Sequence, residues 1–345
     1  MHGRKKGPSA APTAEEEARA RAFAGAYKDA MARRVAARAA GDPTRWPCAP
    51  YDALSVTQAV LREEPEVYSM WGWRREALGA LLEGAAPEAR AGLCADEAAL
   101  VEACLMRNPK SYCAWFHRKW MASRGMVDLA AEMRLIAQML DADERNFHCW
   151  AYRRHVATMQ RAAGQGTRPD DGAALREADM AFVRRKLQQN FSNFSAWHHR
   201  AEAWVRAAPD AAAGGAPLSR SGIESGALVL SHDQLASELT FVRDAIFTEP
   251  DDQSAWLYHR WLLGIGGRRD ARPAPETVLR AEEEVVRELL ELEPDCRHAL
   301  VTLSLIEAAL GDAGAQRGAL ERLSQTDLLR AGAYADKLLQ AGGGP

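Results

Sequence analysis

Apolar residues recur at intervals of three and four along most of this chain. One such run is Leu129, Met133, Ile136 and Leu140, and a second lies within 285–292. This spacing places the apolar side chains on one face of a helix. We find no convincing apolar–polar alternation of period two, which would indicate a strand. The pattern therefore predicts an all-α protein.

A phrase of eight residues that ends in tryptophan occurs five times on top of this pattern. The copies occupy residues 64–71, 108–115, 143–150, 190–197 and 249–256. An arginine follows each tryptophan within four residues, at Arg74, Arg118, Arg153, Arg200 and Arg260. A sixth, decayed copy begins at Glu293 and has Leu300 in the place of tryptophan. A motif that recurs at a period of tens of residues indicates a repeat architecture.

The local chemistry of the phrase predicts a helical hairpin. Proline follows the first residue in four of the six copies, and proline cannot continue the preceding helix. Four positions before the tryptophan stand Ser111, Asn146, Asn193 and Asp252, all residues that cap helix N-termini. One helix thus ends at each phrase and another begins there. The chain is predicted to be a solenoid of helical hairpins.

The repeats are predicted to fill residues 15–335, between a flexible segment 1–14 and a tail 336–345. Gly-, Pro-, Ala- and Ser-rich stretches near 161–171, 207–225 and 264–275 interrupt them and are predicted to be surface loops. The tryptophan and arginine of each phrase are interpreted as scaffold, with the ring packed between hairpins and the guanidinium paired to a neighbouring carboxylate. The histidines within the phrases, except His148, receive the same structural interpretation.

Composition narrows the function. Lys and Arg total 44 against 47 Asp and Glu, a net charge of −3, which gives no basic excess for nucleic acid. No apolar run is long enough for a membrane span, and the polar N-terminus is not that of a signal peptide. Six cysteines without a Cys-x-x-Cys pair are typical of reduced thiols in the cytoplasm and form no zinc motif. The sequence also has no Gly-rich phosphate loop, no nucleophile elbow and no His-Glu-x-x-His helix, which are motifs of enzymes that act by themselves. The residues alone therefore predict a helical repeat protein that wraps around a partner protein.

The phrases are more specific than a general helical repeat. From about Tyr51 to about Leu310 they resemble the repeats of protein prenyltransferase α subunits. The similarity is greatest to the α subunits that act on Rab proteins, because of the N-terminal Met-His-Gly-Arg-Lys and the segment 144–150. In addition, Cys113 stands where the farnesyltransferase type has a glutamine that holds the carboxylate of a CaaX peptide.

This resemblance implies a right-handed superhelical crescent of hairpins that wraps a β subunit. The β subunit would carry the zinc and the isoprenoid pocket, so this chain by itself would hold no metal. The reaction would transfer geranylgeranyl from geranylgeranyl diphosphate to C-terminal cysteines of Rab GTPases presented by the Rab escort protein. Zinc would supply the cysteine as its thiolate.

The resemblance also implies the site residues. Lys110 is the candidate catalytic residue, as the cation that stabilises charge on the leaving diphosphate; in the other five phrases its place is taken by a different residue. Tyr112, His148 and Asn146 are candidate substrate-binding residues, although a helix cap is the first interpretation of Asn146. His2, in the N-terminal segment, is a candidate displaceable ligand of the β subunit's zinc.

Two other functions stay open. The chain resembles, less closely, the α subunit shared by farnesyltransferase and type I geranylgeranyltransferase. A non-catalytic scaffold of the tetratricopeptide kind is the other alternative, but it explains neither a lysine confined to one phrase nor the Trp-x-x-Arg core. The sequence does not identify which Rab proteins are modified.

Overall fold

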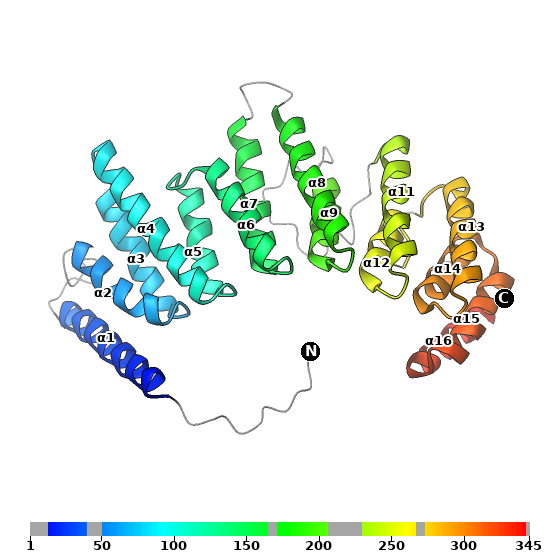
Figure 1. Ribbon diagram of the computed structural model, residues 1–345, viewed down its shortest axis with the longest axis horizontal. Coiled ribbons are helices and arrows are strands. Elements are labelled where there is room, and N and C mark those ends of the chain that lie inside the picture. The colour runs from blue at the N-terminus through cyan, green and yellow to red at the C-terminus, as the bar shows by residue number, and fades with distance from the viewer. Residues whose placement is uncertain (1–12, 40–49, 165–170, 206–229, 267–272, 343–345) are drawn as a thin grey trace. The chain divides into compact units, whose positions relative to one another are not determined.

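The computed structural model describes residues 13–39, 50–164, 171–205, 230–266 and 273–342. His2, the whole predicted loop 207–225 and at least half of each of the other two predicted loops lie outside these ranges. The chain divides into two compact units, residues 1–163 and 164–345. Within the described ranges the regular elements are helices (Figure 1), as the apolar pattern predicts.

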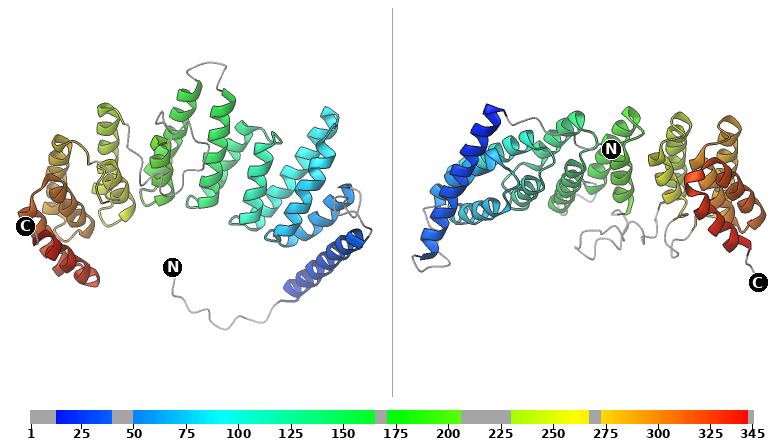
Figure 2. Two further views of the ribbon diagram at one scale, coloured as in Figure 1. Left: turned by 180° about the vertical axis from the view of Figure 1, so that it is seen from behind. Right: turned by 90° about the horizontal axis from the view of Figure 1, so that it is seen from below.

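The first unit contains one leading helix and three hairpins, which Figure 2 shows from behind and from below. The leading helix is α1 (Ala14–Ala39), and the hairpins are α2 (Pro50–Glu63) with α3 (Tyr68–Leu82), α4 (Pro87–Arg107) with α5 (Tyr112–Ser123), and α6 (Leu129–Ala142) with α7 (Phe147–Gly164).

The second unit continues the hairpin pattern. Its hairpins are α8 (Asp171–Gln189) with α9 (Phe194–Val205), α11 (His232–Thr248) with α12 (Gln253–Leu262), and α13 (Glu276–Leu292) with α14 (Arg297–Leu310). These are followed by α15 (Ala313–Thr326), a short 3-10 turn (Leu328–Arg330) and α16 (Ala331–Gly342). Helix α16 continues beyond residue 335, where the repeat domain was expected to end, because Lys337, Leu338, Leu339 and Gln340 are all good helix formers.

Each phrase forms the turn inside a hairpin, as predicted. The first helix ends one residue before the phrase begins, and the second starts at the fifth phrase residue. All four predicted caps are confirmed. Ser111 Oγ accepts the backbone N–H of Ala114 at 3.1 Å, and the carboxamide or carboxylate oxygens of Asn146, Asn193 and Asp252 accept equivalent bonds at the starts of α7, α9 and α12.

The anchor tryptophan closes the same turn with a hydrogen bond. In all five phrases the indole Nε1 donates to the backbone carbonyl six residues earlier, at 2.8 Å each time. The acceptor belongs to the turn, where no helical N–H is available to it. The rings are also almost completely buried, with exposed fractions of 2% or less. Tryptophan recurs because one side chain both fills the core and donates a hydrogen bond to a carbonyl of the turn.

Within each unit, buried carboxylates join neighbouring hairpins. Glu132, on α6, accepts two bonds from Arg118 of the preceding hairpin at 2.7 and 2.8 Å. It also accepts the hydroxyl of Tyr152, from its own hairpin, at 2.6 Å. Burial raises the pKa of Tyr152, and the charge of Glu132 raises it further, so the phenol stays protonated and donates. The predicted pairing with a carboxylate is thereby confirmed for Arg118.

The same arrangement recurs in other hairpins. Glu97 accepts from Arg74 and from His117, with 2.6 Å to His117 Nε2. Burial by itself would raise the pKa of Glu97, but these bonds hold it below the ordinary value. In the second unit Glu238 accepts from Arg200 and Tyr258. His117, His199 and His259 each bond to a buried acid, which is the structural role predicted for them.

The fifth phrase departs from this pattern. His259, not an arginine, stands three residues after Trp256, and its Nε2 lies 2.8 Å from Glu282. The cation for Glu282 comes instead from Arg243 on α11. Arg260, one position later, donates to the hydroxyl of Thr302 at 3.0 Å, and burial lowers its pKa to about 10. Arg260 thus does not occupy the equivalent position of the other four phrase arginines.

We expect Trp115→Phe to destabilise the chain because it removes one of the two donors to the Pro109 carbonyl while keeping an aromatic ring; the other donor is Asn146 Nδ2. The loss of one hydrogen bond from a carbonyl that keeps its second donor costs about 0.5–1.5 kcal/mol, which lowers the melting temperature by a few degrees. Thermal unfolding followed by circular dichroism measures this. The matched control is Trp120→Phe on the same helix, whose indole makes no hydrogen bond in the structure. Equal melting temperatures for the two variants would contradict the role given to the Trp115 N–H.

Candidate functional site

Lys110 lies in the turn between α4 and α5, one residue before the cap Ser111. Asn108 Oδ1 accepts its backbone N–H at 3.2 Å, which fixes the turn. The side chain is 64% exposed, and its Nζ lies 3.6 Å from Asp143 Oδ2. An exposed pair of this kind contributes little to stability. The ammonium group is therefore held loosely and remains accessible to an anionic ligand.

Tyr112 and His148 lie against each other at the starts of α5 and α7. Their rings meet edge to face with centroids 4.2 Å apart. The tyrosine is exposed, whereas His148 is only 8% exposed and its Nε2 has no hydrogen-bond partner among the described residues. Burial lowers the pKa of His148, and the nearby charge of Lys119 lowers it further. The imidazole is therefore neutral near pH 7.

Asn146 connects the turns of the second and third phrases. Its Nδ2 donates to the carbonyl of Pro109 at 2.9 Å, and its Oδ1 accepts the backbone N–H groups of His148 and Cys149 at 3.1 Å each. These bonds engage both polar atoms of a side chain that is 2% exposed. The geometry assigns Asn146 a structural role as cap and brace, and its predicted contact with substrate stays a prediction.

The structure therefore brings together all four predicted site residues that it describes. We call Lys110, Tyr112, Asn146 and His148 the α5–α7 site. Lys110 and Tyr112 present exposed polar groups, His148 supports the tyrosine ring, and Asn146 fixes the start of the helix that carries His148. The site can donate a positive charge and a hydroxyl hydrogen bond to an anion.

Cys113 lies beside this site but has the opposite character. Its Sγ donates to the carbonyl of Glu66 at 3.6 Å. Burial, together with the nearby charge of Glu66, raises the pKa of the thiol to about 11. The side chain is a neutral thiol whose proton is already engaged. It is therefore poorly suited to hold a carboxylate.

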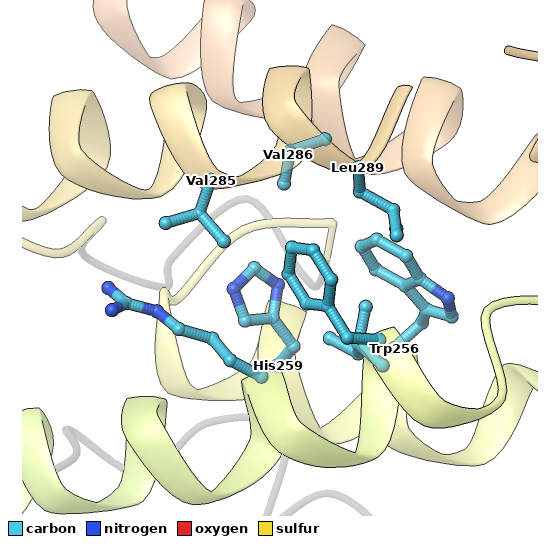
Figure 3. A pocket seen from close by; sticks show the side chains of 8 residues that line it. Trp256, His259, Val285, Val286 and Leu289 are labelled. Carbon is cyan, nitrogen blue, oxygen red and sulfur yellow. The ribbon is translucent and has the colours of Figure 1, made fainter. Parts of the chain in front are cut away.

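The described residues offer no candidate metal site, and one pocket in the second unit is far smaller than an isoprenoid. Figure 3 shows a pocket of the second unit, where Trp256 and His259 of α12 point toward Val285, Val286 and Leu289 of α13. Its cavity of about 10 Å³ is at the lower limit for one water molecule. The described residues contain no group of three or more His, Cys, Asp or Glu side chains able to hold a metal ion. Nor do they include a helix long and apolar enough to cross a membrane.

Sequence reasoning missed the cations next to the site. Lys119 occupies the position four residues after Trp115, and its charge reaches both His148 and His155. The signal was present, since Arg75 and Arg154 hold the same position after Trp71 and Trp150. The sequence prediction used the phrase arginines, most of which stand three residues after the tryptophan, and did not include this second series of cations.

Comparison with known proteins identifies the repeat. The protein prenyltransferase alpha subunit repeat matches residues 94–125, 129–160, 176–206 and 235–265, and the first two matches include the whole α5–α7 site. A solved structure titled Candida albicans protein geranylgeranyltransferase-I complexed with GGPP covers 84% of this chain and 84% of its own, with a TM-score of 0.61 and 21% identity. At that identity the likeness supports the fold alone.

Relatives in sequence carry a more specific name. The human protein named geranylgeranyl transferase type-2 subunit alpha is 37% identical over 278 residues, which make up 79% of this chain and 43% of the human one. This chain thus spans less than half the length of its mammalian relatives. The Dictyostelium discoideum protein of the same name is 32% identical over 75% of this chain and 74% of its own. With this similarity and four copies of the repeat, the chain belongs to the protein prenyltransferase α-subunit family, with the geranylgeranyl transferase type-2 α subunits as its relatives.

Proposed function

We propose that this chain is the α subunit of a type-2 protein geranylgeranyltransferase that acts in the cytoplasm. The α5–α7 site carries the proposal, because it places an accessible ammonium group and a phenol side by side within a matched family repeat, residues 94–125. The complete enzyme would comprise this chain and a β subunit. Its substrates would be geranylgeranyl diphosphate and a Rab GTPase presented by an escort protein.

The chemistry divides between the two subunits. The cysteine sulfur forms a bond to C1 of the isoprenoid while the bond from C1 to the diphosphate oxygen breaks. Zinc, held by residues of the β subunit, supplies the sulfur as thiolate when it is bound. The α5–α7 site fits the other half of the reaction, since Lys110 offers an exposed cation and Tyr112 a hydroxyl donor.

Each residue of the α5–α7 site then has a role. Lys110 stabilises the negative charge that grows on the leaving diphosphate, and its weak pairing with Asp143 is readily exchanged for that anion. The Tyr112 hydroxyl donates a hydrogen bond to the same group. His148 positions the tyrosine ring through the edge-to-face contact. Asn146 acts through His148 and is a positioning residue.

The state of Cys113 favours a type-2 enzyme over the α subunit that serves CaaX substrates. An enzyme that reads a C-terminal carboxylate needs a strong donor near that carboxylate. Cys113 is a neutral thiol whose proton bonds to the Glu66 carbonyl. A substrate recognised through its folded domain and an escort protein does not require such a donor.

Co-expression with β subunits tests the function. We expect the chain to form a stable heterodimer with a type-2 β subunit. That heterodimer should transfer labelled geranylgeranyl to a full-length Rab that ends in two cysteines, in the presence of escort protein, and the isolated chain should transfer none. A CaaX peptide serves as the control substrate. Preferential pairing with a farnesyltransferase β subunit and transfer to the CaaX peptide would establish the first alternative, and failure to bind any β subunit would leave a scaffold.

In that heterodimer Lys110→Ala should slow the chemical step. The loss of one preorganised cation typically costs about 2–4 kcal/mol in the transition state, a reduction of roughly 30- to 1000-fold. Single-turnover kinetics with preformed ternary complex measures it. Arg145→Ala provides a matched control, because Arg145 holds the equivalent place in the next phrase and is also exposed. Equal rates for the two variants would assign Lys110 to the solvated surface.

A further inference from the structure

A second series of cations runs along the first unit. Arg75, Lys119 and Arg154 each stand four residues after an anchor tryptophan, on α3, α5 and α7. Seven residues before each, on the same face two turns away, lies an exposed aromatic ring: Tyr68, Tyr112 and Phe147, with exposed fractions of 67%, 66% and 50%. We call these six residues the basic–aromatic face.

Two of these cations, Arg75 and Lys119, form no ion pair with an acidic side chain among the described residues. Arg75 lies with its guanidinium 5.3 Å from the centre of the Phe116 ring, and its buried Nη1 has no hydrogen-bond partner. Lys119 is partly buried and has no ion-pair partner among the described residues. Their immediate neighbours on the same helices, Arg74 and Arg118, are by contrast paired to buried glutamates. Arg75 and Lys119 therefore have no acidic partner among the described residues.

The lack of an acidic partner is unfavourable for the charged form of Lys119. Burial lowers the pKa of its ammonium group, and the nearby charge of Arg154 lowers it further. Partial burial of a cation is unfavourable unless an anion compensates it. Close by, the buried Nε2 of His148 also lacks a partner. Glu66 is the acid whose charge reaches His148, but it makes no ion pair with Lys119.

We propose that the basic–aromatic face docks an acidic surface of the β subunit, with carboxylates that pair with Arg75 and Lys119. The inference rests on the proposed function and specifies the chemistry of its subunit contact. Two features favour a protein partner over a free phosphate or diphosphate. The cations stand on successive hairpins, whose packed helices lie about 8–10 Å apart, so one small anion does not span them. The exposed rings beside them offer the apolar area that protein interfaces bury.

The partner's carboxylates should therefore be spaced by about one hairpin repeat and lie next to apolar side chains. When the surfaces meet, the carboxylates lose water together with Arg75 and Lys119. Pairs of opposite charge in such an interface fix the register of docking and slow dissociation. The α5–α7 site lies on the same helices as the face, so this register also sets where Lys110 and Tyr112 stand relative to the partner.

Subunit exchange in the purified heterodimer tests the inference. Labelled α chain in the complex is chased with excess unlabelled complex at several NaCl concentrations. We expect Lys119→Glu to speed dissociation at least tenfold, Arg75→Glu to act in the same direction, and Lys119→Met to have a smaller effect. The salt dependence of dissociation should weaken in all three variants, because fewer ion pairs remain to be screened. Arg134→Glu, an exposed residue on α6 of the next hairpin, is the control and should exchange as the wild type does.

Circular dichroism of each variant complex before the chase establishes that it is folded. Wild-type exchange rates and salt dependence in Lys119→Glu and Arg75→Glu would overturn the proposal while leaving the proposed function intact. Weakened binding of geranylgeranyl diphosphate with unchanged subunit exchange would also overturn it and assign the cations to substrate. If the wild-type chain formed no heterodimer at all, the proposed function itself would fail.

Discussion

A buried carboxylate shared between successive hairpins is the interaction on which each unit depends. Glu132 shows why: it accepts from Arg118 of one hairpin and Tyr152 of the next, so neither hairpin can shift without leaving a buried charge unpaired. Removing one partner from such a group typically costs about 3–5 kcal/mol. Hydrophobic burial holds the helices together without direction, whereas these bonds fix the register of one hairpin on another.

That register positions the α5–α7 site. Lys110 and Tyr112 belong to one turn and His148 to the next, so their arrangement exists only if hairpins two and three are locked. The brace from Asn146 to the Pro109 carbonyl fixes the turns from the outside, and the Arg118–Glu132 pair fixes them from within. The exposed groups of the site are then not needed to hold the hairpins together. Structural and exposed residues can be immediate neighbours in the chain: Arg74 forms a buried ion pair with Glu97, whereas Arg75 has no ion-pair partner among the described residues.

Much of this was predictable from the sequence because it depends on local chemistry. The phrase predicted the hairpin turns, the four caps and the buried tryptophans, since capping and turn formation involve residues close in the chain. The acids were missed because the three that bond to a phrase arginine lie at varying separations from it, of 23, 14 and 38 residues. The acids are regularly spaced with respect to another residue: in four hairpins the acid precedes the His or Tyr that it bonds in the same hairpin by 20 residues. Because this spacing within a hairpin is constant, the insertions fall between hairpins. The spacing of the tryptophans alone does not show this. Exposure of Lys110 and engagement of the Cys113 thiol required coordinates, because both depend on neighbouring turns.

The most direct test of this account is a double-mutant cycle on Arg118 and Glu132. Urea unfolding of the wild type, Arg118→Met, Glu132→Gln and the double variant gives the coupling free energy between the two side chains. The account predicts a large cost for each single change and a double variant much less destabilised than their sum, with a coupling of about 2–3 kcal/mol. The exposed pair Arg280 and Glu276 on α13 serves as reference, with an expected coupling of about 0.3–0.5 kcal/mol. Additive effects at Arg118 and Glu132, or a coupling no larger than that of the exposed pair, would contradict the claim that buried carboxylates lock the hairpins.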